Sequence, residues 1–316
     1  MTPSTPIPPA DLALMQRLAQ QVTALRPDLV NGDASYGELA WNQASPNPGG
    51  TSHRHRIWTS GGEPVAWGWA RLPRRVRLSD GSVRDVTGAS LAHQVHPDHP
   101  ALVDEVIAWF DETAAGLERS VVAGAADVSA LERWAAHGYG TDPDALGDTG
   151  SWTQLNERDL TGGVERPRLP DGHRFLTADE AGPEAAVRAH VDAWAPSAYT
   201  LEAYERVRST AAYRGDLHVL VEAPDGTMAA STIMWLDEAN ATAEFEPVGT
   251  HPAHRRRGLA RAMLLHGMHL ARAAGAEHMT VACLGADGHS SARELYYGVG
   301  FRAFSRDAPL TKPATA

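Results

Sequence analysis

The chain has 316 residues, of which 43% are hydrophobic and 21% charged, and its formal net charge is −11. This length predicts two domains of about 150 residues each, and the negative charge argues against broad nucleic-acid binding, which depends on neutralising phosphates. The single cysteine, Cys283, excludes an intramolecular disulfide framework and a multi-cysteine metal site, and no apolar run reaches the roughly 20 residues of a membrane helix.

The chain begins M-T-P-S-T-P-I-P-P, which has neither the basic nor the apolar region of a signal peptide, so we expect a cytoplasmic protein. Apolar periodicity then predicts the elements of the first half. The helices are expected at 10–25, 36–43, 101–117 and 127–137, and the strands at 55–60, 64–72, 90–95, 119–124 and 152–156.

Residues 157–172 contain glycine and proline near their centre and end, which predicts a linker. The same periodicities continue after it. Strands are expected at 174–177, 216–222, 228–236, 241–250 and 278–284, with a last one beginning at 301–304, and helices at 184–194, 201–210, 258–274 and 290–297.

The two halves repeat each other. Both give the same order of helices and strands, and two short segments also match. His96-Pro97-Asp98-His99 corresponds to His251-Pro252-Ala253-His254, and residues 130–139 correspond to 292–301, at nearly the same offset. We therefore predict an α/β (mixed α+β) fold of two tandem domains, each a mostly antiparallel mixed sheet flanked by helices. They cover 1–156 and 173–316, joined by the linker 157–172.

The stretch from Glu244 to Ala260 combines a strand, a basic turn and a helix start. The N–H groups of a first helical turn have no partner within the helix, so this layout favours an anion such as a pyrophosphate. The first half has Pro100, Val103 and Glu105 where the second has Arg255, Gly258 and Ala260, and Trp134 where the second has Tyr296. The first half is therefore predicted to be degenerate and to pack against the second, although a second active site remains the alternative.

Two motifs of the second half resemble those of the GNAT superfamily of acyl-CoA-dependent N-acetyltransferases. Arg255-x-x-Gly258-x-Ala260 is similar to the family's pyrophosphate loop, and Ala292-x-x-Leu295-Tyr296-x-x-x-Gly300-Phe301 is similar to its A-x-x-L-Y-x-x-x-G-F helix. The tandem arrangement also resembles that of mycothiol synthases, which join a degenerate and an active GNAT domain. Where many family members have Asn before the helix alanine, this chain has His289.

The resemblance implies that acetyl-CoA is the co-substrate and that no metal takes part. It implies that Val248, Gly249 and Thr250 line the slot for the pantetheine arm, and that the turn after them holds the pyrophosphate. The expected binding residues are Val248, Gly249, Thr250, Arg255, Arg256, Arg257, Gly258, Leu259, Ala260, Arg261, His289 and Ala292.

Acetyl transfer also needs a base for the amine and an acid for the thiolate. Glu244 and Glu246 share one face of the strand, since side chains alternate with period two. Related acetyltransferases place the base at the position of Glu244, so Glu244 is the predicted base. Glu246, or a water between the carboxylate and the amine, is the alternative. Tyr296 aligns with the family's proton donor. A covalent route through Cys283 is the less favoured alternative.

The sequence thus predicts an enzyme that transfers acetyl from acetyl-CoA to a primary amine by direct attack. The expected partner is a small-molecule amine, with no nucleic acid and no membrane. The first half either shapes the acceptor cleft or stabilises the pair. The protein is expected to be a monomer, as a pseudo-dimer of its two domains, or a homodimer. A non-catalytic acyl-CoA-binding or regulatory protein, and an acetyltransferase for protein N-termini or lysines, are the alternatives.

Overall fold

The computed structural model describes residues 7–44 and 53–314. The first half contributes α1 (Pro9–Leu25), α2 (Tyr36–Trp41), β1 (His53–Ser60), β2 (Glu63–Arg71), β3 (Arg74–Arg77), β4 (Val83–Val86), β5 (Ala89–Val95), α3 (Leu102–Thr113), β6 (Arg119–Gly124), α4 (Val128–Ala136), β7 (Gly140–Thr141) and β8 (Thr153–Asp159). The second half contributes β9 (Arg174–Thr177), α5 (Ala178–Ala181), α6 (Pro183–Ala193), α7 (Leu201–Arg208), β10 (His218–Glu222), β11 (Met228–Asp237), β12 (Thr242–Thr250), α8 (Leu259–Ala273), β13 (His278–Leu284), α9 (Ser290–Gly298) and β14 (Arg302–Lys312).

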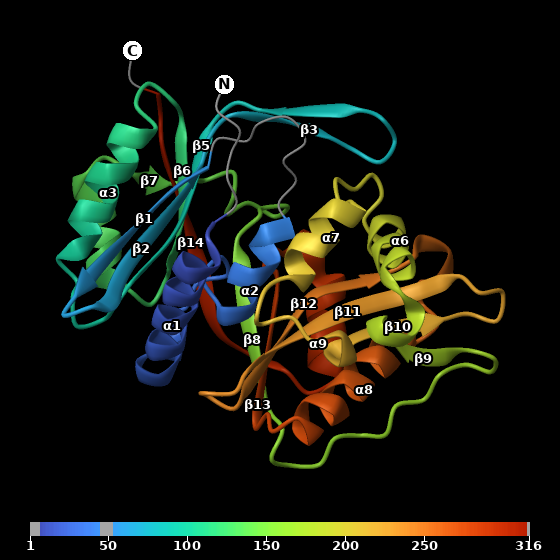
Figure 1. Ribbon diagram of the computed structural model, residues 1–316. Coiled ribbons are helices and arrows are strands. Elements are labelled where there is room, and N and C mark those ends of the chain that lie inside the picture. The colour runs from blue at the N-terminus through green and yellow to red at the C-terminus, as the bar shows by residue number, and fades with distance from the viewer. Residues whose placement is uncertain (1–6, 45–52, 315–316) are drawn as a thin grey trace.

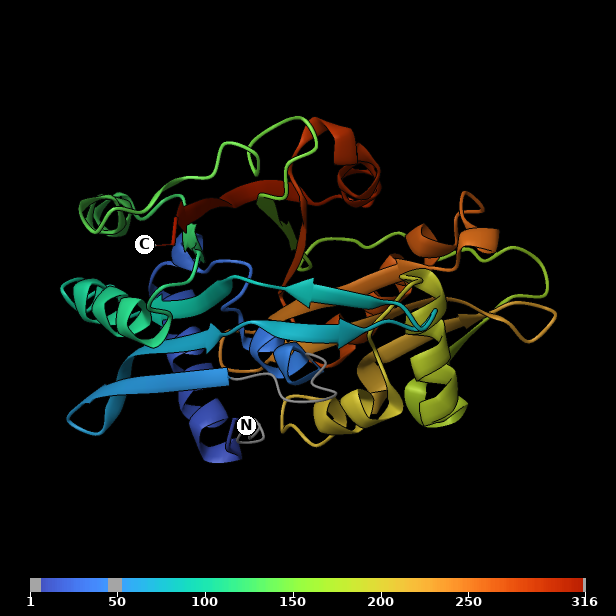
Figure 2. The ribbon, with the colours of Figure 1, turned by 90° about the horizontal axis from the view of Figure 1, so that it is seen from above.

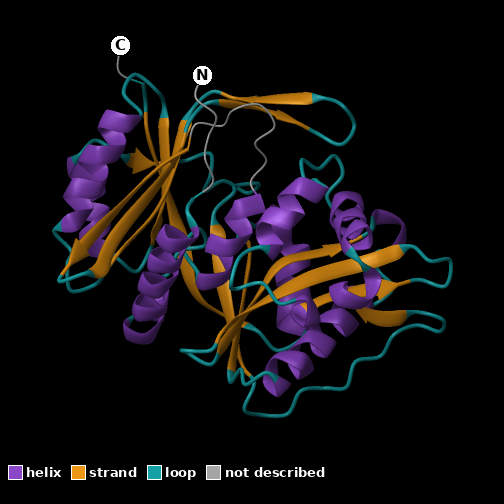
Figure 3. Ribbon diagram, in the orientation of Figure 1, coloured by secondary structure: helices purple, strands orange, loops and turns teal. Residues whose placement is uncertain are grey.

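One mixed twelve-stranded sheet runs through both halves, and helices lie on both sides of it (Figures 1 and 3). Its strand order is β1-β2-β5-β6-β14-β8-β13-β12-β11-β10-β9, with β7 also paired to β14. The pairs β5–β6 and β12–β13 are parallel, and the others along this path are antiparallel. The predicted fold class, a mixed and mostly antiparallel sheet flanked by helices, is confirmed.

Local signals in the sequence set several helix ends. The Ser35 hydroxyl accepts a hydrogen bond from the Glu38 amide at the start of α2, and Asp127 accepts one from the Ala130 amide at the start of α4. Such caps satisfy N–H groups that have no partner within the helix. Gly275 follows α8 with a φ of 104°, a conformation that costs glycine little and other residues more.

The two halves exchange their last strands. β8 belongs to the first half by sequence, yet it pairs along its length with β13 of the second half. β14 pairs through Arg302–Arg306 with β8 and then through Asp307–Lys312 with β6 of the first half. Figure 1 shows β14 crossing between the halves. Each half therefore completes the sheet of the other.

The exchange bears on the predicted domain division. The predicted linker 157–172 overlaps β8, because Glu157–Asp159 continue the pairing with β13. These three residues extend β8 beyond the strand end expected at 156. We propose that the division into 1–156 and 173–316 describes the two repeats, with β8 and β14 exchanged between their sheets.

The parallel pairs reflect the repeat seen in the sequence. β5 runs to β6 through α3, just as β12 runs to β13 through α8. A parallel pair needs such a crossover connection, since a tight turn can join only antiparallel strands. The pair β12–β13 and the start of α8 position the candidate site.

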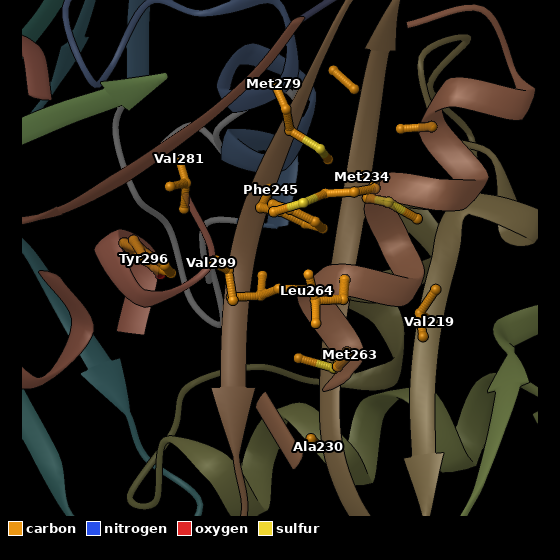
Figure 4. Packing of buried hydrophobic residues seen from close by; sticks show 14 of the residues in the cluster. Val219, Ala230, Met234, Phe245, Met263, Leu264, Met279, Val281, Tyr296 and Val299 are labelled. Atoms are coloured by element: carbon orange, nitrogen blue, oxygen red, sulfur yellow. The ribbon is translucent and has the colours of Figure 1, made fainter. Parts of the chain in front are cut away.

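The core of the second half lies between α8 and the sheet. Met234 on β11 and Phe245 on β12 are fully buried there, together with Met263 and Leu264 on α8 (Figure 4). A Cβ on Gly267 would lie 2.7 Å from the Phe245 ring, so glycine allows α8 to approach the sheet closely. Truncating a buried Phe to Ala costs about 3–5 kcal/mol. This packing therefore fixes β12 firmly against α8.

The hairpin β3–β4 was not expected from the sequence. Its first strand, R-R-V-R, is charged and short, so it shows no apolar alternation. The hairpin reaches over the second half (Figure 2), where its turn residue Ser79 contacts the loop between α6 and α7. The Ser79 N–H donates to the Ser197 carbonyl oxygen at 2.7 Å, and the Ser197 N–H donates to the Ser79 hydroxyl at 3.0 Å. No helix within 7–44 and 53–314 is long and apolar enough to cross a membrane.

Candidate active site

β12 and β13 separate halfway along their length. Thr242–Phe245 pair in parallel with His278–Val281, and the pairing ends there. Beyond this point β13 continues to pair with β8, while β12 continues with β11 to Thr250. The backbone of Glu246–Thr250 therefore has no ladder hydrogen bonds to β13. This opening contains Val248, Gly249 and Thr250, where the resemblance implies the slot for the pantetheine arm.

The turn between β12 and α8 forms a concave surface of backbone N–H groups. Arg256 has a φ of 61° and Gly258 a φ of 79°, and Gly258 is the N-cap of α8. A turn that contains residues with positive φ can direct several neighbouring N–H groups toward one point. Such a concave surface of N–H groups favours the binding of an anion. A pocket opens here, lined by Thr250, His254, Arg255, Arg256, Gly258, Leu259, Ala260, Arg261, Ser291, Ala292, Glu294 and Leu295. The turn and the first residues of α9 thus face the same space.

The four arginines of the turn differ in their contacts. Arg255 donates to the carbonyl oxygens of Thr250 and Ala193, each at 3.2 Å, so it ties β12 to α6. Arg261 donates to the Gly298 carbonyl and pairs with Glu165, each at 2.6 Å. Arg256 and Arg257 are exposed and form no ion pair with the described residues. The side chains free to meet phosphates are therefore those of Arg256 and Arg257. Leu259 is buried, so only its backbone faces the turn.

The start of α9 provides the other wall of the pocket. Ala292 lines it, as the motif led us to expect. His289 occupies the N-cap position of α9, but its side chain makes no cap hydrogen bond. Its Nε2 lies 3.2 Å from the Thr149 carbonyl oxygen. The imidazole therefore contacts the first half, in contrast with the role in holding pantetheine that the family's Asn suggests.

Tyr296 lies on α9 and is buried beside Val281 (Figure 4). Burial raises the pKa of its phenol, and the charges of Glu246 and Cys283 raise it further. The phenol therefore keeps its proton at neutral pH and can donate it. The next residue, Tyr297, is more exposed and accepts a hydrogen bond from Gln154 of β8 at 3.0 Å, which fits the packing role expected for it.

Glu244 is held by α2 of the first half. The Ser35 hydroxyl donates to its carboxylate at 2.6 Å. Burial nevertheless raises the pKa of Glu244, because desolvation outweighs the opposing effect of Ser35 and of the nearby backbone of Gly37 and Glu38. Through Ser35, which also caps α2, Glu244 joins α2 to β12.

Glu246 lies two residues after Glu244 on β12, next to the opening between β12 and β13. Burial, and then the charge of Glu244, raise its pKa to about 8. Its charge is also one of the causes of the raised pKa of Tyr296, after burial. Its carboxylate accepts no stabilising hydrogen bond from the described residues. A carboxylate with a pKa near the working pH is suited to act as a general base.

The sequence analysis missed the contribution of α2. Glu38, on this helix, has its pKa raised well above the usual range by burial and by the nearby charges of Glu246, Asp33 and Glu244. The S-x-x-E pattern of Ser35–Glu38 is a signature of a helix start and could have located α2. It could not have shown that α2 packs on a strand some 200 residues later in the chain.

A second pocket lies on the α2 side of the sheet, close to Pro247. Its two adjoining parts share Trp41, His190 and Tyr199, and their walls include α2, the end of β2 and the loop between α6 and α7. Trp194, at the end of α6, stacks on His190 with ring centroids 4.4 Å apart. Trp235 contacts Gly37, and its Nε1 donates to the Glu246 carbonyl at 2.7 Å. Trp194 therefore borders this pocket, and Trp235 connects α2 with the backbone of Glu246.

The alternative chemistries find little support in the geometry. Burial raises the pKa of the Cys283 thiol, which disfavours the nucleophilic thiolate. Its hydrogen-bond partner is the Asn156 amide, 3.5 Å away. Among the described residues no group of three or more His, Cys, Asp or Glu side chains is placed to hold a metal ion. In the first half, Trp134 is buried against Tyr139, and Glu105 accepts a hydrogen bond from Trp58.

Comparison with known proteins agrees with this geometry. Residues 184–301 match the model of the acetyltransferase (GNAT) family. A GCN5-related N-acetyltransferase from Sphaerobacter thermophilus has a similar structure, with a TM-score of 0.61 and 19% identity over 98% of this chain and 94% of that chain. A tandem GNAT protein from the clavulanic acid biosynthesis pathway has a TM-score of 0.65 and 17% identity over 97% and 96%. No curated protein sequence matches the chain. Residues 184–301 therefore resemble the acetyltransferase (GNAT) family, and the chain has the fold of a tandem GNAT protein.

Proposed function

We propose that the protein transfers acetyl from acetyl-CoA to a primary amine by direct attack. The observation that carries the proposal is the separation of β12 from β13 at Glu246, directly before a turn built for an anion and beside Tyr296. A thioester held along this opening would have its phosphates at the turn and its reacting carbon near both titratable groups. Acetyl-CoA supplies the activated acetyl group.

The binding roles follow from the contacts. The N–H groups of the turn from Arg256 to Arg261 and the side chains of Arg256 and Arg257 bind the phosphates. The unpaired edge of Val248–Thr250 binds the pantetheine arm through its backbone. Arg255 and Arg261 act indirectly, because their hydrogen bonds hold the turn against α6 and α9.

We assign the base to Glu246 and a positioning role to Glu244. Glu246 removes a proton from the ammonium, directly or through a water, which frees the nitrogen lone pair for attack on the thioester carbon. As the new C–N bond forms and the C–S bond breaks, Tyr296 donates its proton to the leaving sulfur. The bonded nitrogen then gives up its second proton, directly or through a water, to the tyrosinate, which yields the amide and restores the phenol. Glu244 keeps α2 in place and, through its charge, keeps the pKa of Glu246 high.

A small-molecule acceptor suits the pocket better than a protein does. The hairpin β3–β4 crosses toward the second half, and its contact with Ser197 adds a wall beside the pocket. A protein terminus or a lysine would need an open groove. We therefore propose that the first half shapes a pocket for a small amine.

The test is the release of free thiol from acetyl-CoA with a panel of primary amines. Turnover with at least one amine, and its loss in Tyr296→Phe with unchanged binding of coenzyme A, would support the enzyme over a non-catalytic binding protein. If no amine gives thiol release and acetyl-CoA does not protect the protein from thermal unfolding, the proposal is wrong. Protection without turnover would favour the binding protein.

A further inference from the structure

The pocket on the α2 side contains a cationic side chain from the first half. Its more open part has about 600 Å³ of empty space and is lined by Trp41, Asn42, Ala44, Arg71, His190, Ser197, Ala198 and Tyr199. Arg71, at the end of β2, is the charged group among these described residues, because burial lowers the pKa of His190 to about 4. The pocket thus offers one fixed positive charge in a protein whose net charge is −11.

The charge of Arg71 is not neutralised by an ion pair. Its guanidinium donates to the neutral Asn42 side chain and lies over the Trp69 ring, 5.5 Å from its centroid. Neither Arg71 nor its neighbour Arg74 has a carboxylate partner within 4.0 Å among the described residues, and their Nε atoms are buried without a hydrogen bond. Residues 45–52, which the structure does not describe, contain no Asp or Glu.

The arginines also affect one another. Arg74 has a lowered pKa, caused first by burial and then by the charges of Arg71 and Arg84. Glu38 is the carboxyl group that responds to Arg71, but burial and the charges of Glu246 and Asp33 favour its neutral form. Clustered, partly buried cations without a counterion are costly unless an anion binds among them.

We propose that the acceptor amine also carries a carboxylate, and that Arg71 binds it while the amine faces Glu246. The acceptor would then belong to the amino-acid class. This inference rests on the proposed acetyl transfer and narrows its substrate. The planar guanidinium fork matches a carboxylate. A phosphate dianion fits less well, because the charges of Glu244 and Glu246 would repel two negative charges more strongly than one.

The aromatic side chains of the pocket also favour an acceptor of the amino-acid class. Trp41 and His190 have ring centroids 5.3 Å apart, and His190 and Tyr199 have centroids 4.4 Å apart. These rings line both parts of the pocket, between Arg71 in the more open part and Pro247, the residue after Glu246, in the other. Such a lining suits the hydrocarbon part of a molecule whose amine and carboxylate bind at its two ends.

The experiment compares matched pairs of acceptors in the thiol-release assay. Each pair is an amino acid and the amine that results from removing its carboxylate, for example lysine with cadaverine and phenylalanine with phenethylamine. We expect the amino acid to have a kcat/KM about 10- to 100-fold higher in at least one pair, as expected for a hydrogen bond to a charged group. An equal or higher value for the decarboxylated amine in every pair would refute the inference.

Variants of Arg71 and a control variant test whether the Arg71 side chain causes the preference for a carboxylate. Arg71→Gln should raise the KM for the amino acid about 10- to 100-fold with little change in kcat, and should leave the decarboxylated amine unaffected. Arg75→Gln is the matched control, because Arg75 is exposed on the neighbouring strand β3 and pairs with Asp85. Arg71→Lys should restore part of the preference. If Arg71→Gln lowers turnover of both members equally, Arg71 is only structural and the inference fails.

The two proposals fail in distinguishable ways. If amines are turned over with no preference for those that carry a carboxylate, the proposed acetyl transfer is supported and the inference about Arg71 is refuted. If no amine is turned over, calorimetric titration of the same pairs with coenzyme A present still measures the preference. Tighter binding of the amino acid, lost in Arg71→Gln, would then support the inference, and equal binding would reject it.

Discussion

The assignment of Glu246 as base and Glu244 as positioning residue can be tested by two isosteric changes. Glu246→Gln removes the only proton acceptor that we place at the amine, so kcat should fall by about 10²- to 10⁴-fold, the usual contribution of a general base. The KM for acetyl-CoA should change little, because the phosphate turn and the slot backbone are untouched. Thiol release at saturating acetyl-CoA measures both constants.

Glu244→Gln should act on stability and on the pKa of its neighbour. The carboxylate of Glu244 accepts a hydrogen bond from the Ser35 hydroxyl at 2.6 Å. A glutamine replaces this charged acceptor by a neutral one, and hydrogen bonds to neutral groups stabilise a protein less than those to charged groups. The unfolding free energy should therefore fall by about 1 kcal/mol. Denaturant unfolding measures this loss.

The same change should shift the pH profile. The charge of Glu244 contributes to the raised pKa of Glu246, so its removal should lower that pKa and move the rise of kcat/KM to lower pH. Glu246→Gln should show no such shift and a low rate at every pH. If Glu244→Gln abolishes turnover while Glu246→Gln keeps it, the roles are reversed and the reasoning from α2 is refuted.

The remaining predictions concern the acid, the pH dependence and the phosphates. Tyr296→Phe should lower kcat by about 10²-fold or more at unchanged KM for acetyl-CoA, and a normal rate in the thiol-release assay would exclude Tyr296 as the acid. The folded-state pKa of Glu246 is raised from 4.5 to about 8, so the folded protein binds this proton more tightly than the unfolded chain does. Unfolding free energy should therefore fall as the pH rises from about 5 to 8 while kcat/KM rises, and Glu246→Gln should flatten both curves. Replacing Arg256 and Arg257 by Gln should raise the KM for acetyl-CoA and weaken its salt dependence, whereas a change in kcat alone would contradict their role.

The parts of the site that the sequence predicted are those encoded by short local patterns. Arg255, Gly258 and Ala260 lie within one turn, and Ala292 and Tyr296 within one helix, so spacing alone brings each set together. In the structure, Arg255, Gly258, Ala260 and Ala292 line one pocket. Tyr296 lies on the same helix as Ala292. The separation of β12 from β13 follows in the same way, because the strand that precedes the turn was identified with nearly correct bounds.

The choice between Glu244 and Glu246 could not be made from the sequence. Both face the same side of β12, and period-two alternation gives no reason to prefer one. The difference comes from Ser35 at the start of α2, whose hydroxyl donates to the carboxylate of Glu244 and not to that of Glu246. The place of Arg71 in the acceptor pocket has the same origin, since no local pattern near β2 indicates a contact with α6. Tertiary contacts between distant segments decide both.

The strand exchange explains how the first half can lack the anion-binding residues and still serve the site. It has Pro100, Val103 and Glu105 where an anion turn needs free N–H groups and a glycine. The positions that contact the second half, such as Ser35 on Glu244 and the β8 ladder beside β13, support the geometry of the active half. The first half therefore acts through the surfaces it shares with the second, where α2 positions the carboxylates and β2 brings Arg71 to the acceptor.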